Sequence, residues 1–268
     1  MTPLAQLLYA VEDSEEEIVQ LLCDLVGFPT VNSGVMPTGN ELPLCEFLKE
    51  RLAREGIPST ILPSADNRAN LVARLEGNTG GPSLLFMAHT DVVPVEDEAE
   101  WTRSPFQGTV AEGRVWGRGA ADMKGMLAAE IMAMIILRRA GLKLQGDLIL
   151  AAGADEETGG EYGFGWLAAH APETIRADFA VNEGGGAPVA TDHGLVYIIN
   201  VGEKGRLEVK ITVPGKSGHA AAPWRSDNAL FKLSEIIKRL EEYQPEIDVS
   251  HPVFEHLPPL LGLQKPIM

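Results

Sequence analysis

The stretch from Leu84 to Gly125 contains residue types that could bind a divalent cation. It reads LLFMAHTDVVPVEDEAEWTRSPFQGTVAEGRVWGRGAADMKG, and its apolar start leads directly into His89 and Asp91. Side chains two residues apart in an extended chain point the same way, so Asp91 could accept the second imidazole N–H of His89 and fix its tautomer. A single histidine after a strand is more often an ordinary surface or core residue. The paired aspartate puts a metal ligand on an equal footing with that interpretation.

A second aspartate, Asp122, follows a glycine-rich turn and opens an apolar segment with helical patterning. The helix dipole alone would explain a carboxylate among the first residues of a helix. It does not explain the surrounding sequence, Gly117-Arg118-Gly119 before Asp122 and Lys124-Gly125 after it. Glycine at this density indicates a backbone held close to another group, which favours a ligand position.

Two later stretches, ADEETGG at 154–160 and VNEGGG at 181–186, supply further carboxylates. Glu156 and Glu157 are adjacent, so one can bind a metal while the other faces substrate and acts as a general base. Each signal taken alone also fits a charged loop or turn, and this holds for Glu183 as well. Together they fit a co-catalytic pair of divalent metal ions. The histidine favours zinc, while manganese or cobalt accept similar N/O ligands.

Hydrophobic patterning places these residues after the strands of an α/β domain. The predicted helices are Leu7–Phe28, Asn40–Gly56, Met123–Ala140 and Gly163–His170, and the predicted strands are Ser59–Leu62, Asn70–Leu75, Ser83–Ala88, Asp147–Ala152 and Ala177–Val181, with a hairpin at Thr109–Trp116. Alternating strands and helices predict a mostly parallel sheet, in which ligands bind beyond the carboxyl ends of the strands. The residues His89, Asp91, Glu156, Glu157 and Glu183 all follow a predicted strand end.

The pattern changes after about His193. Two segments, Leu195–Val201 and Leu207–Val213, alternate like half-exposed antiparallel strands, and an amphipathic helix around 230–240 follows them. We therefore predict a catalytic metal-binding domain over residues 1–193 and the start of an α+β domain over residues 194–268.

Composition excludes several other classes of function. The net charge of −16 argues against a nucleic-acid or anionic-membrane surface, because such partners require a basic patch. The N-terminus lacks a basic region, no apolar run approaches the roughly 20 residues of a membrane span, and the chain has only 2 cysteines. These features predict a cytoplasmic protein. A nucleotide-binding enzyme is also disfavoured. Gly215-Lys216-Ser217 resembles the end of a P-loop, but Lys210 occupies the position of the first glycine of that motif.

The motifs AHTDVVP, GRGAADMKG, ADEETGG, VNEGG and SGHAAAP occur in this order and resemble those of the M20 metallopeptidases. That family includes acetylornithine deacetylase, succinyl-diaminopimelate desuccinylase, aminoacylase and glutamate carboxypeptidase. The resemblance covers residues from about 10 to about 240. It implies a zinc-hydrolase catalytic domain followed by a lid, and hydrolysis of an N-acyl amino acid or small peptide by a metal-bound hydroxide.

The resemblance also implies a role for each site residue. His89 and Glu183 would bind the first metal, Glu157 the second, and Asp122 would bridge both. Glu156 would be the general base and Asp91 the partner of His89, and the peptide bond after Asp122 would be cis.

His219, in SGHAAAP, would belong to a lid that also forms a homodimer interface and would reach the partner subunit's site to stabilise the tetrahedral intermediate. Members of the family are longer than this chain, and their later segment supplies a last histidine ligand. The alternative hypothesis is therefore a truncated, non-catalytic fragment or module that binds a metal or a partner.

Overall fold

The computed structural model describes residues 2–78, 80–184, 189–191, 194–197, 209–248, 250, 252 and 254. Within it the chain divides into two compact units, Met1–Glu183 and Gly184–Met268. The boundary that we predict from the sequence follows residue 193. All the predicted metal ligands lie in the first unit, and His219 lies in the second.

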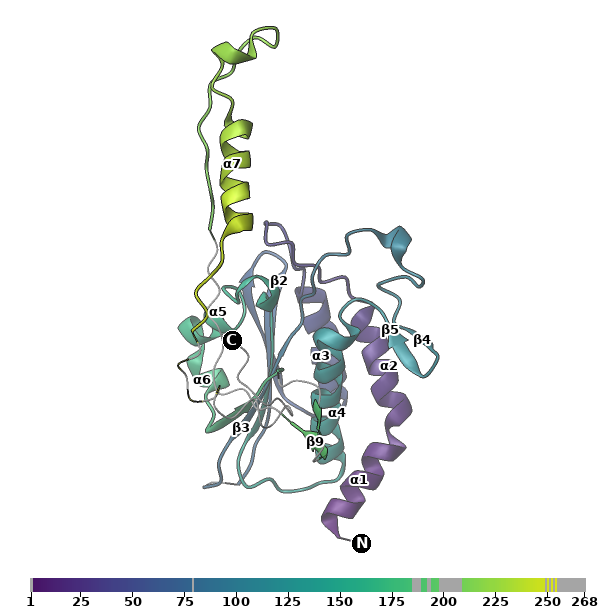
Figure 1. Cartoon of the computed structure of the whole chain (residues 1–268). Helices are drawn as coiled ribbons and strands as arrows, with labels where there is room; N and C mark the ends of the chain where they lie inside the picture. The colour runs from purple at the N-terminus through teal and green to yellow at the C-terminus, as the bar shows by residue number, and fades with distance from the viewer. Residues whose placement is uncertain are drawn as a thin grey trace. The chain divides into compact units, whose positions relative to one another are not determined.

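A five-stranded sheet forms the centre of the first unit (Figure 1). Its strands, in spatial order, are β1 (Ser59–Ala65), β2 (Arg68–Leu75), β6 (Leu148–Gly153), β3 (Leu84–His89) and β7 (Phe179–Val181). β6, β3 and β7 are parallel, whereas β2 is antiparallel to both β6 and β1. β2 alone therefore runs against the other strands, which confirms the predicted α/β fold with a mostly parallel sheet.

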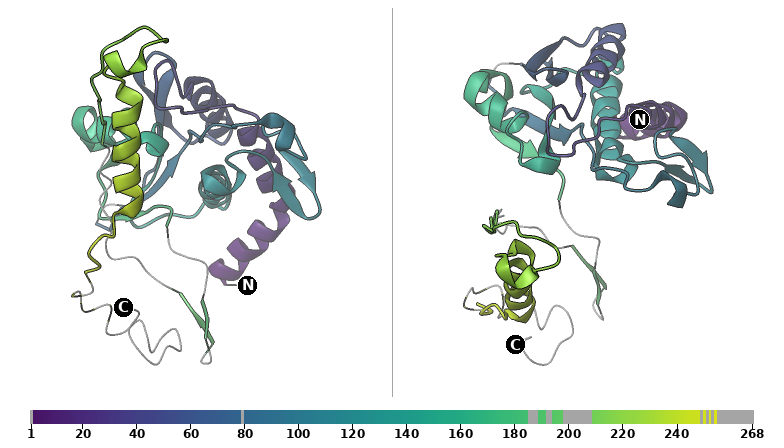
Figure 2. Two further views of the ribbon diagram at one scale, coloured as in Figure 1. Left: turned by 45° about the horizontal axis from the view of Figure 1, so that its top comes forward. Right: turned by 90° about the horizontal axis from the view of Figure 1, so that it is seen from above.

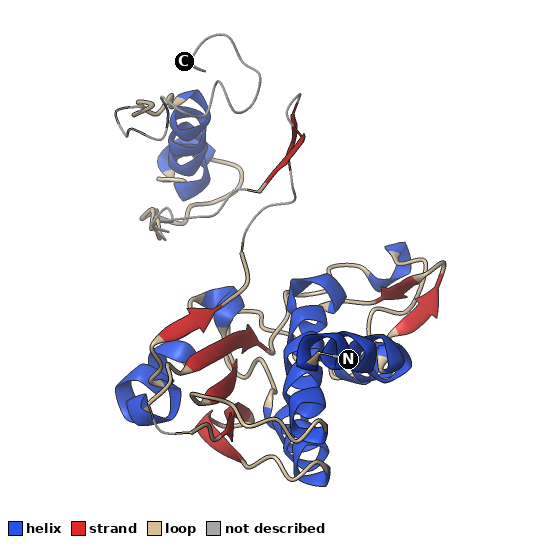
Figure 3. Cartoon of the chain, turned by 90° about the horizontal axis from the view of Figure 1, so that it is seen from below, coloured by secondary structure: helices blue, strands red, loops and turns tan. Residues whose placement is uncertain are grey.

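Helices cover both faces of this sheet (Figure 3). One face packs against α2 (Glu15–Val26), α3 (Leu42–Arg54) and α4 (Gly125–Arg139), with a core of leucine, isoleucine, alanine and methionine. The other face packs against α5 (Phe164–His170) and α6 (Pro172–Ile175) through a smaller cluster. Residues of β6 alternate between the two clusters, as expected for a strand buried on both faces.

The N-terminal helical pattern forms two helices, α1 (Pro3–Asp13) and α2, separated at Ser14. The helix predicted over Asn40–Gly56 is shorter, α3 at Leu42–Arg54. Asn40 has φ of 56°, and Glu41 is the residue that precedes α3. The predicted hairpin is confirmed as β4 (Thr109–Ala111) and β5 (Arg114–Trp116), with positive φ at Glu112 and Gly113. Single turns of helix occur at η1 (Glu98–Glu100) and η3 (Glu156–Thr158), and η2 (Ala120–Lys124) is a turn whose Asp122 and Met123 are not helical.

The second unit contains the hairpin of β8 (Val189–Thr191) and β9 (Gly194–Val196), a turn η4 (Pro223–Arg225) and a helix α7 (Ala229–Glu242) (Figure 2). The amide of Asn228 caps α7 at the N–H of Leu230. Residues 209–213 form no strand, and the rest of the strand predicted at Leu207–Val213 lies outside the described residues, as do residues 198–201 of the one before it. Among the helices described, none is long and apolar enough to cross a bilayer.

Candidate metal centre

The carboxyl ends of β3 and β6 lie side by side at one edge of the sheet. His89 is the last residue of β3, and it is in register with Gly153, the last residue of β6. The loop after β6 carries Glu156 and Glu157, so parallel pairing brings this loop next to the histidine. The pairing of β3 with β6 thus places His89 next to the loop that carries Glu156 and Glu157.

The His89 ring is buried, with 1% of the side chain exposed, and its nitrogens face different partners. Nδ1 lies 3.0 Å from the backbone oxygen of Asp91 and 3.4 Å from Asp91 Oδ1. Because both oxygens can only accept, Nδ1 carries a hydrogen. In the neutral ring Nε2 then has a free lone pair, as a metal ligand requires.

Three carboxylates surround that nitrogen. His89 Nε2 lies 3.0 Å from Asp122 Oδ1, 3.4 Å from Glu183 Oε1 and 3.8 Å from Glu156 Oε2. The exposed fractions of these side chains are 70% for Asp122, 51% for Glu156 and 30% for Glu183, so the cluster has a buried histidine at its base and an open mouth.

Asp122 reaches this cluster from a turn and not from a helix, so its predicted position in the first turn of a helix is wrong. Its φ and ψ of −121° and 103° are extended, and α4 begins only at Gly125. The peptide bond from Asp122 to Met123 is cis, as the resemblance implied. Gly119 has φ of 82°, and a Cβ there would lie 2.5 Å from Val92 Cγ1. The glycines therefore allow the close approach that their density predicted.

Asp91 anchors the loop that carries the glutamates. Its carboxylate is fully buried and accepts the backbone N–H groups of Glu156 at 3.1 Å and Glu157 at 3.3 Å. A third donor, the side-chain amide of Asn32, lies 2.8 Å away. Asp91 thus touches both the histidine and the turn of the two glutamates.

A second buried carboxylate, Asp155, begins the same turn at φ of 66°. It accepts from Arg68 Nη1 at 3.0 Å, from the Thr158 hydroxyl at 2.6 Å and from the Tyr162 N–H at 3.1 Å. Arg68 also pairs with buried Glu41, with Nη2 2.6 Å from Oε1. Burial opposes ionisation of Asp155, but these hydrogen bonds and the charge of Arg68 outweigh it, so the pKa is lowered.

The electrostatics of the cluster favour a bound cation. Burial raises the pKa of Glu183 to about 7, helped by Asp122 and Glu156 and opposed by His89. Burial also opposes protonation of His89, but Asp91, Glu183 and Asp122 outweigh it and raise the His89 pKa to about 9. Within the described residues, the carboxylates of Asp122, Glu156 and Glu183 form no ion pair with a lysine or arginine. The charge of a divalent ion would replace the shared protons.

The donor set fits such an ion. Ligand atoms of His89, Asp122 and Glu183 all lie within 4.8 Å of one another. Glu157 is outside this group, although its pKa is raised by burial and by nearby Asp122. His219 lies in the second unit, where its Nδ1 accepts the N–H of Ala221 at 3.1 Å. The structure therefore brings together His89, Asp122, Glu183 and Glu156 and supports them with Asp91.

Comparison with known proteins identifies the family. The sequence model described as Peptidase family M20/M25/M40 matches residues 85–257, which include every motif described above. The chain belongs to this family. Among its curated relatives, a probable succinyl-diaminopimelate desuccinylase of Staphylococcus aureus is 34% identical to this chain over 254 residues. A succinyl-diaminopimelate desuccinylase of Gluconacetobacter diazotrophicus is 39% identical over 192 residues.

The chain spans about half the length of these relatives. It aligns over 91% of its own length with 58% of the Staphylococcus aureus protein, and over 69% with 47% of the Gluconacetobacter diazotrophicus protein. An M20 family metallo-carboxypeptidase from Sulfolobus solfataricus has the same fold, with a TM-score of 0.61 at 20% identity over 93% of this chain and 60% of that one. Human carnosine dipeptidase 1 gives 0.57 at 20% identity, over 68% and 41%.

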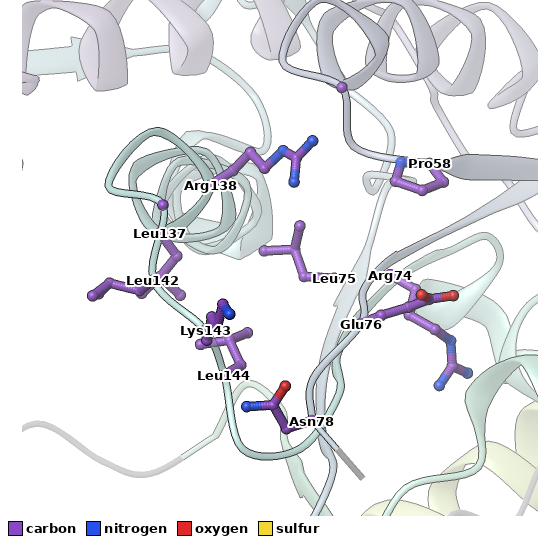
Figure 4. Close-up of a pocket in the computed structure, with 12 residues that line it drawn as sticks. Pro58, Arg74, Leu75, Glu76, Asn78, Leu137, Arg138, Leu142, Lys143 and Leu144 are labelled. Carbon is purple, nitrogen blue, oxygen red and sulfur yellow. The ribbon is translucent and has the colours of Figure 1, made fainter.

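A cavity of about 490 Å³ lies at the opposite edge of the sheet from the cluster (Figure 4). It is lined by Leu75 at the end of β2, which pairs with Leu148, the first residue of β6. Arg138 and Leu142, from the end of α4 and the loop after it, form the facing wall. None of the predicted site residues lines this cavity, so the chemistry of the M20 motifs is not located there.

Sequence reasoning missed the buried polar residues beneath the cluster. Asn32, Arg68 and Asp155 are each almost fully buried, and so is Lys124, whose Nζ donates to the carbonyls of Leu25 at 3.0 Å and Phe28 at 2.7 Å. The available signal was Arg68 at the start of an otherwise buried strand, where an unpaired charge would be unfavourable.

Proposed function

We propose that this protein is a metal-dependent hydrolase that cleaves the amide bond of an N-acyl amino acid or small peptide. The observation that carries the proposal is the convergence of ligand atoms from His89, Asp122 and Glu183 within 4.8 Å of one another. Membership of the M20 peptidase family supports the same chemistry.

The residues divide into metal ligands and one free carboxylate. His89 and Glu183 would hold one metal, Asp122 would bridge, and Glu157 would hold a second, with zinc as the first choice of ion. When bound, such ions polarise the substrate carbonyl and lower the pKa of the attacking water. In the described site Glu157 lies outside the tight group, so its assignment rests on the motif and on its proximity to Asp122.

Glu156 is our candidate for the general base. Its carboxylate is half exposed, 3.8 Å from His89 Nε2, and its backbone is fixed by Asp91. It would take a proton from the attacking water and pass it to the leaving nitrogen, so that no free amine anion forms. Asp91 would hold the Nδ1 hydrogen of His89 and keep the Glu156 turn in place.

The lid, the assembly and the location of the protein are further parts of the proposal. His219 would stabilise the oxyanion of the tetrahedral intermediate from a second copy of the chain, which requires a homodimer. The cysteines Cys23 and Cys45 are both free, which fits a cytoplasmic, reducing compartment.

The curated relatives suggest the first substrate to test. They are named succinyl-diaminopimelate desuccinylases, so N-succinyl-diaminopimelate leads a panel that also contains N-acetyl amino acids and dipeptides. The experiment measures release of free amine by the zinc-loaded chain, with Glu156→Gln as the control. Turnover that disappears in Glu156→Gln would support the proposal. A folded, zinc-bound chain that turns over nothing in the panel would favour the non-catalytic alternative.

A further inference from the structure

Asn32 contacts Asp91 and Asp155, two carboxylates of the candidate metal centre, although it belongs to no predicted motif. Below, the metal cluster means the side chains of His89, Asp122, Glu156 and Glu183. Its side chain is 1% exposed. The preceding residue, Val31, forms a parallel bridge with Val92, and the Asn32 N–H donates to the Val92 carbonyl at 2.8 Å. The backbone of Asn32 is therefore fixed beside the end of β3, one residue beyond Asp91.

The amide of Asn32 links the two buried carboxylates of the site. Its Nδ2 lies 2.8 Å from Asp91 Oδ2 and 3.0 Å from Asp155 Oδ1. The Thr158 hydroxyl oxygen is also 3.0 Å away, and the Asn32 Oδ1 accepts the N–H of Gly34 at 3.1 Å. An amide NH₂ has two hydrogens to donate, so it can serve both carboxylates at once.

Both carboxylates hold the loop after β6, and Asp91 also contacts the histidine. Asp91 contacts His89 at the end of β3 and accepts the N–H groups of Glu156 and Glu157. Asp155 fixes the start of the loop after β6 through Arg68 and Tyr162. Asn32 joins these two carboxylates directly through its side chain.

The link has an electrostatic reason. Asp91 and Asp155 are both ionisable and almost fully buried, and like charges repel strongly where water is excluded. Arg68 supplies one positive charge, which it divides between Asp155 and Glu41. A hydrogen-bond donor between the two aspartates reduces their mutual repulsion.

We propose that Asn32 is a positioning residue, which sets the separation between His89 and the Glu156–Glu157 pair by bridging Asp91 and Asp155. The inference rests on the proposed function in so far as these residues hold and serve the metal. The bridge would fix the separation between His89, assigned above to one metal, and the loop that carries Glu156 and Glu157, the candidate base and the ligand assigned to the other metal.

The chain offers a matched control in Asn70. This asparagine is also fully buried and also holds the loop after β6, since its Oδ1 accepts the N–H of Ala154 at 2.9 Å and its Nδ2 donates to the Tyr162 carbonyl at 3.0 Å. Its hydrogen-bond partners are backbone groups and not carboxylates. Substitution of Asn70 should therefore report the stability of the loop without changing the spacing of the aspartates.

The experiment compares Asn32→Asp with Asn70→Asp in the full chain. Zinc affinity is measured by competition with a chelator, and the coordination of Co²⁺ is followed by its visible absorption spectrum. Amide exchange at Glu156 and Glu157 is measured by NMR in the metal-free protein. We expect Asn32→Asp to weaken zinc binding about 10- to 100-fold, alter the Co²⁺ spectrum and accelerate both amides. We expect Asn70→Asp to lower Tm while zinc affinity stays within about threefold of wild type.

Two results would overturn the proposal: an Asn32→Asp protein with unchanged affinity and unchanged amide protection, or equal losses of affinity in both variants. If Asn32→Asp does not fold, Asn32→Ser decides, because a single hydroxyl can donate to only one aspartate and should give an intermediate loss. If the wild-type chain binds no zinc, the proposed function fails, and the amide exchange still tests the bridge.

Discussion

The first unit contains two clusters of charged side chains that differ in their balance of charge. The metal cluster consists of His89, Asp122, Glu156 and Glu183, and none of its carboxylates pairs with a lysine or arginine among the described residues. The helix cluster consists of Glu17, Glu55, Arg51 and Arg139, and joins α2, α3 and α4. There Arg139 Nη1 lies 2.7 Å from Glu17, Arg139 Nη2 lies 2.6 Å from Glu55, and Arg51 contacts both glutamates.

This difference in charge balance distinguishes a cluster that stabilises the packing of helices from a cluster that could bind a cation. In the helix cluster each negative charge has a positive partner, and hydrogen bonds from Arg139 and Arg51 hold the pKa of Glu55 at about 2. In the metal cluster the pKa of Glu183 is raised to about 7, so ionisation is unfavourable in the folded, metal-free chain. Unbalanced charge that the protein itself does not neutralise indicates a site for an external cation. The following changes test this contrast.

The largest effect is expected for Glu156→Gln. In the protein that turns over substrate, loss of the general base should reduce the rate about 10²- to 10⁴-fold, while zinc content and Tm stay unchanged. The measurement is initial rate with the best substrate of the panel, together with metal analysis of the same sample. Full activity in Glu156→Gln would remove this residue from the role of base.

His89→Ala should weaken the binding of one zinc ion by at least about 10-fold, because it removes the nitrogen ligand at the base of the cluster. Calorimetric titration with zinc measures the loss. Ala substitution of His170, an exposed histidine on α5 whose Nδ1 lies 3.1 Å from the Trp166 carbonyl, is the matched control and should leave the affinity unchanged. Unaltered binding in His89→Ala would contradict its assignment as a ligand.

Glu183→Gln should raise the Tm of the metal-free protein at pH 8, by roughly 2–4 °C for each kcal/mol of relief. The folded-state pKa of about 7 lies above the ordinary value of 4.5, so the folded chain binds more protons between these values. Stability conferred by Glu183 is therefore lost as pH rises from about 4.5 to about 7. The difference between variant and wild type should shrink at pH 5. A lower Tm for Glu183→Gln at pH 8 would contradict this account.

Glu55→Gln should have the opposite sign and a small size, about 1 kcal/mol of destabilisation at pH 7. Here the folded-state pKa of about 2 lies below the ordinary value of 4.5, so the stabilisation is present above pH 4.5 and disappears as pH falls to 2. Thermal melts at pH 7 and pH 2 measure it. A Tm difference that persists at pH 2 would show that packing, and not charge, is lost in the variant.

The sheet and its order of motifs could be predicted because local patterns specify them. Buried strands such as Leu148–Gly153 are continuous apolar runs, and the parallel arrangement places His89 and Glu156 at the same edge. The resemblance implied the cis peptide bond after Asp122, but the helical pattern around Asp122 did not predict its extended φ and ψ.

The supporting network could not be predicted, because its members are far apart in the chain. Asn32 contacts Asp155 across 123 residues and Arg68 contacts it across 87. A single asparagine or arginine has no periodicity to identify it, and its partners are set by the tertiary fold. Charge balance, the property that distinguishes the two clusters, is likewise visible only once the fold brings the residues together.

The most direct test of the metal cluster is the amount of zinc that the folded chain retains after equilibration and removal of free metal, compared with the double variant His89→Ala, Asp122→Asn. The account predicts that the wild type retains at least about one equivalent of zinc and that the double variant, folded under the same conditions, retains none. A wild-type chain that retains no zinc, or a double variant that retains as much as the wild type, would contradict the assignment of this cluster as a metal centre.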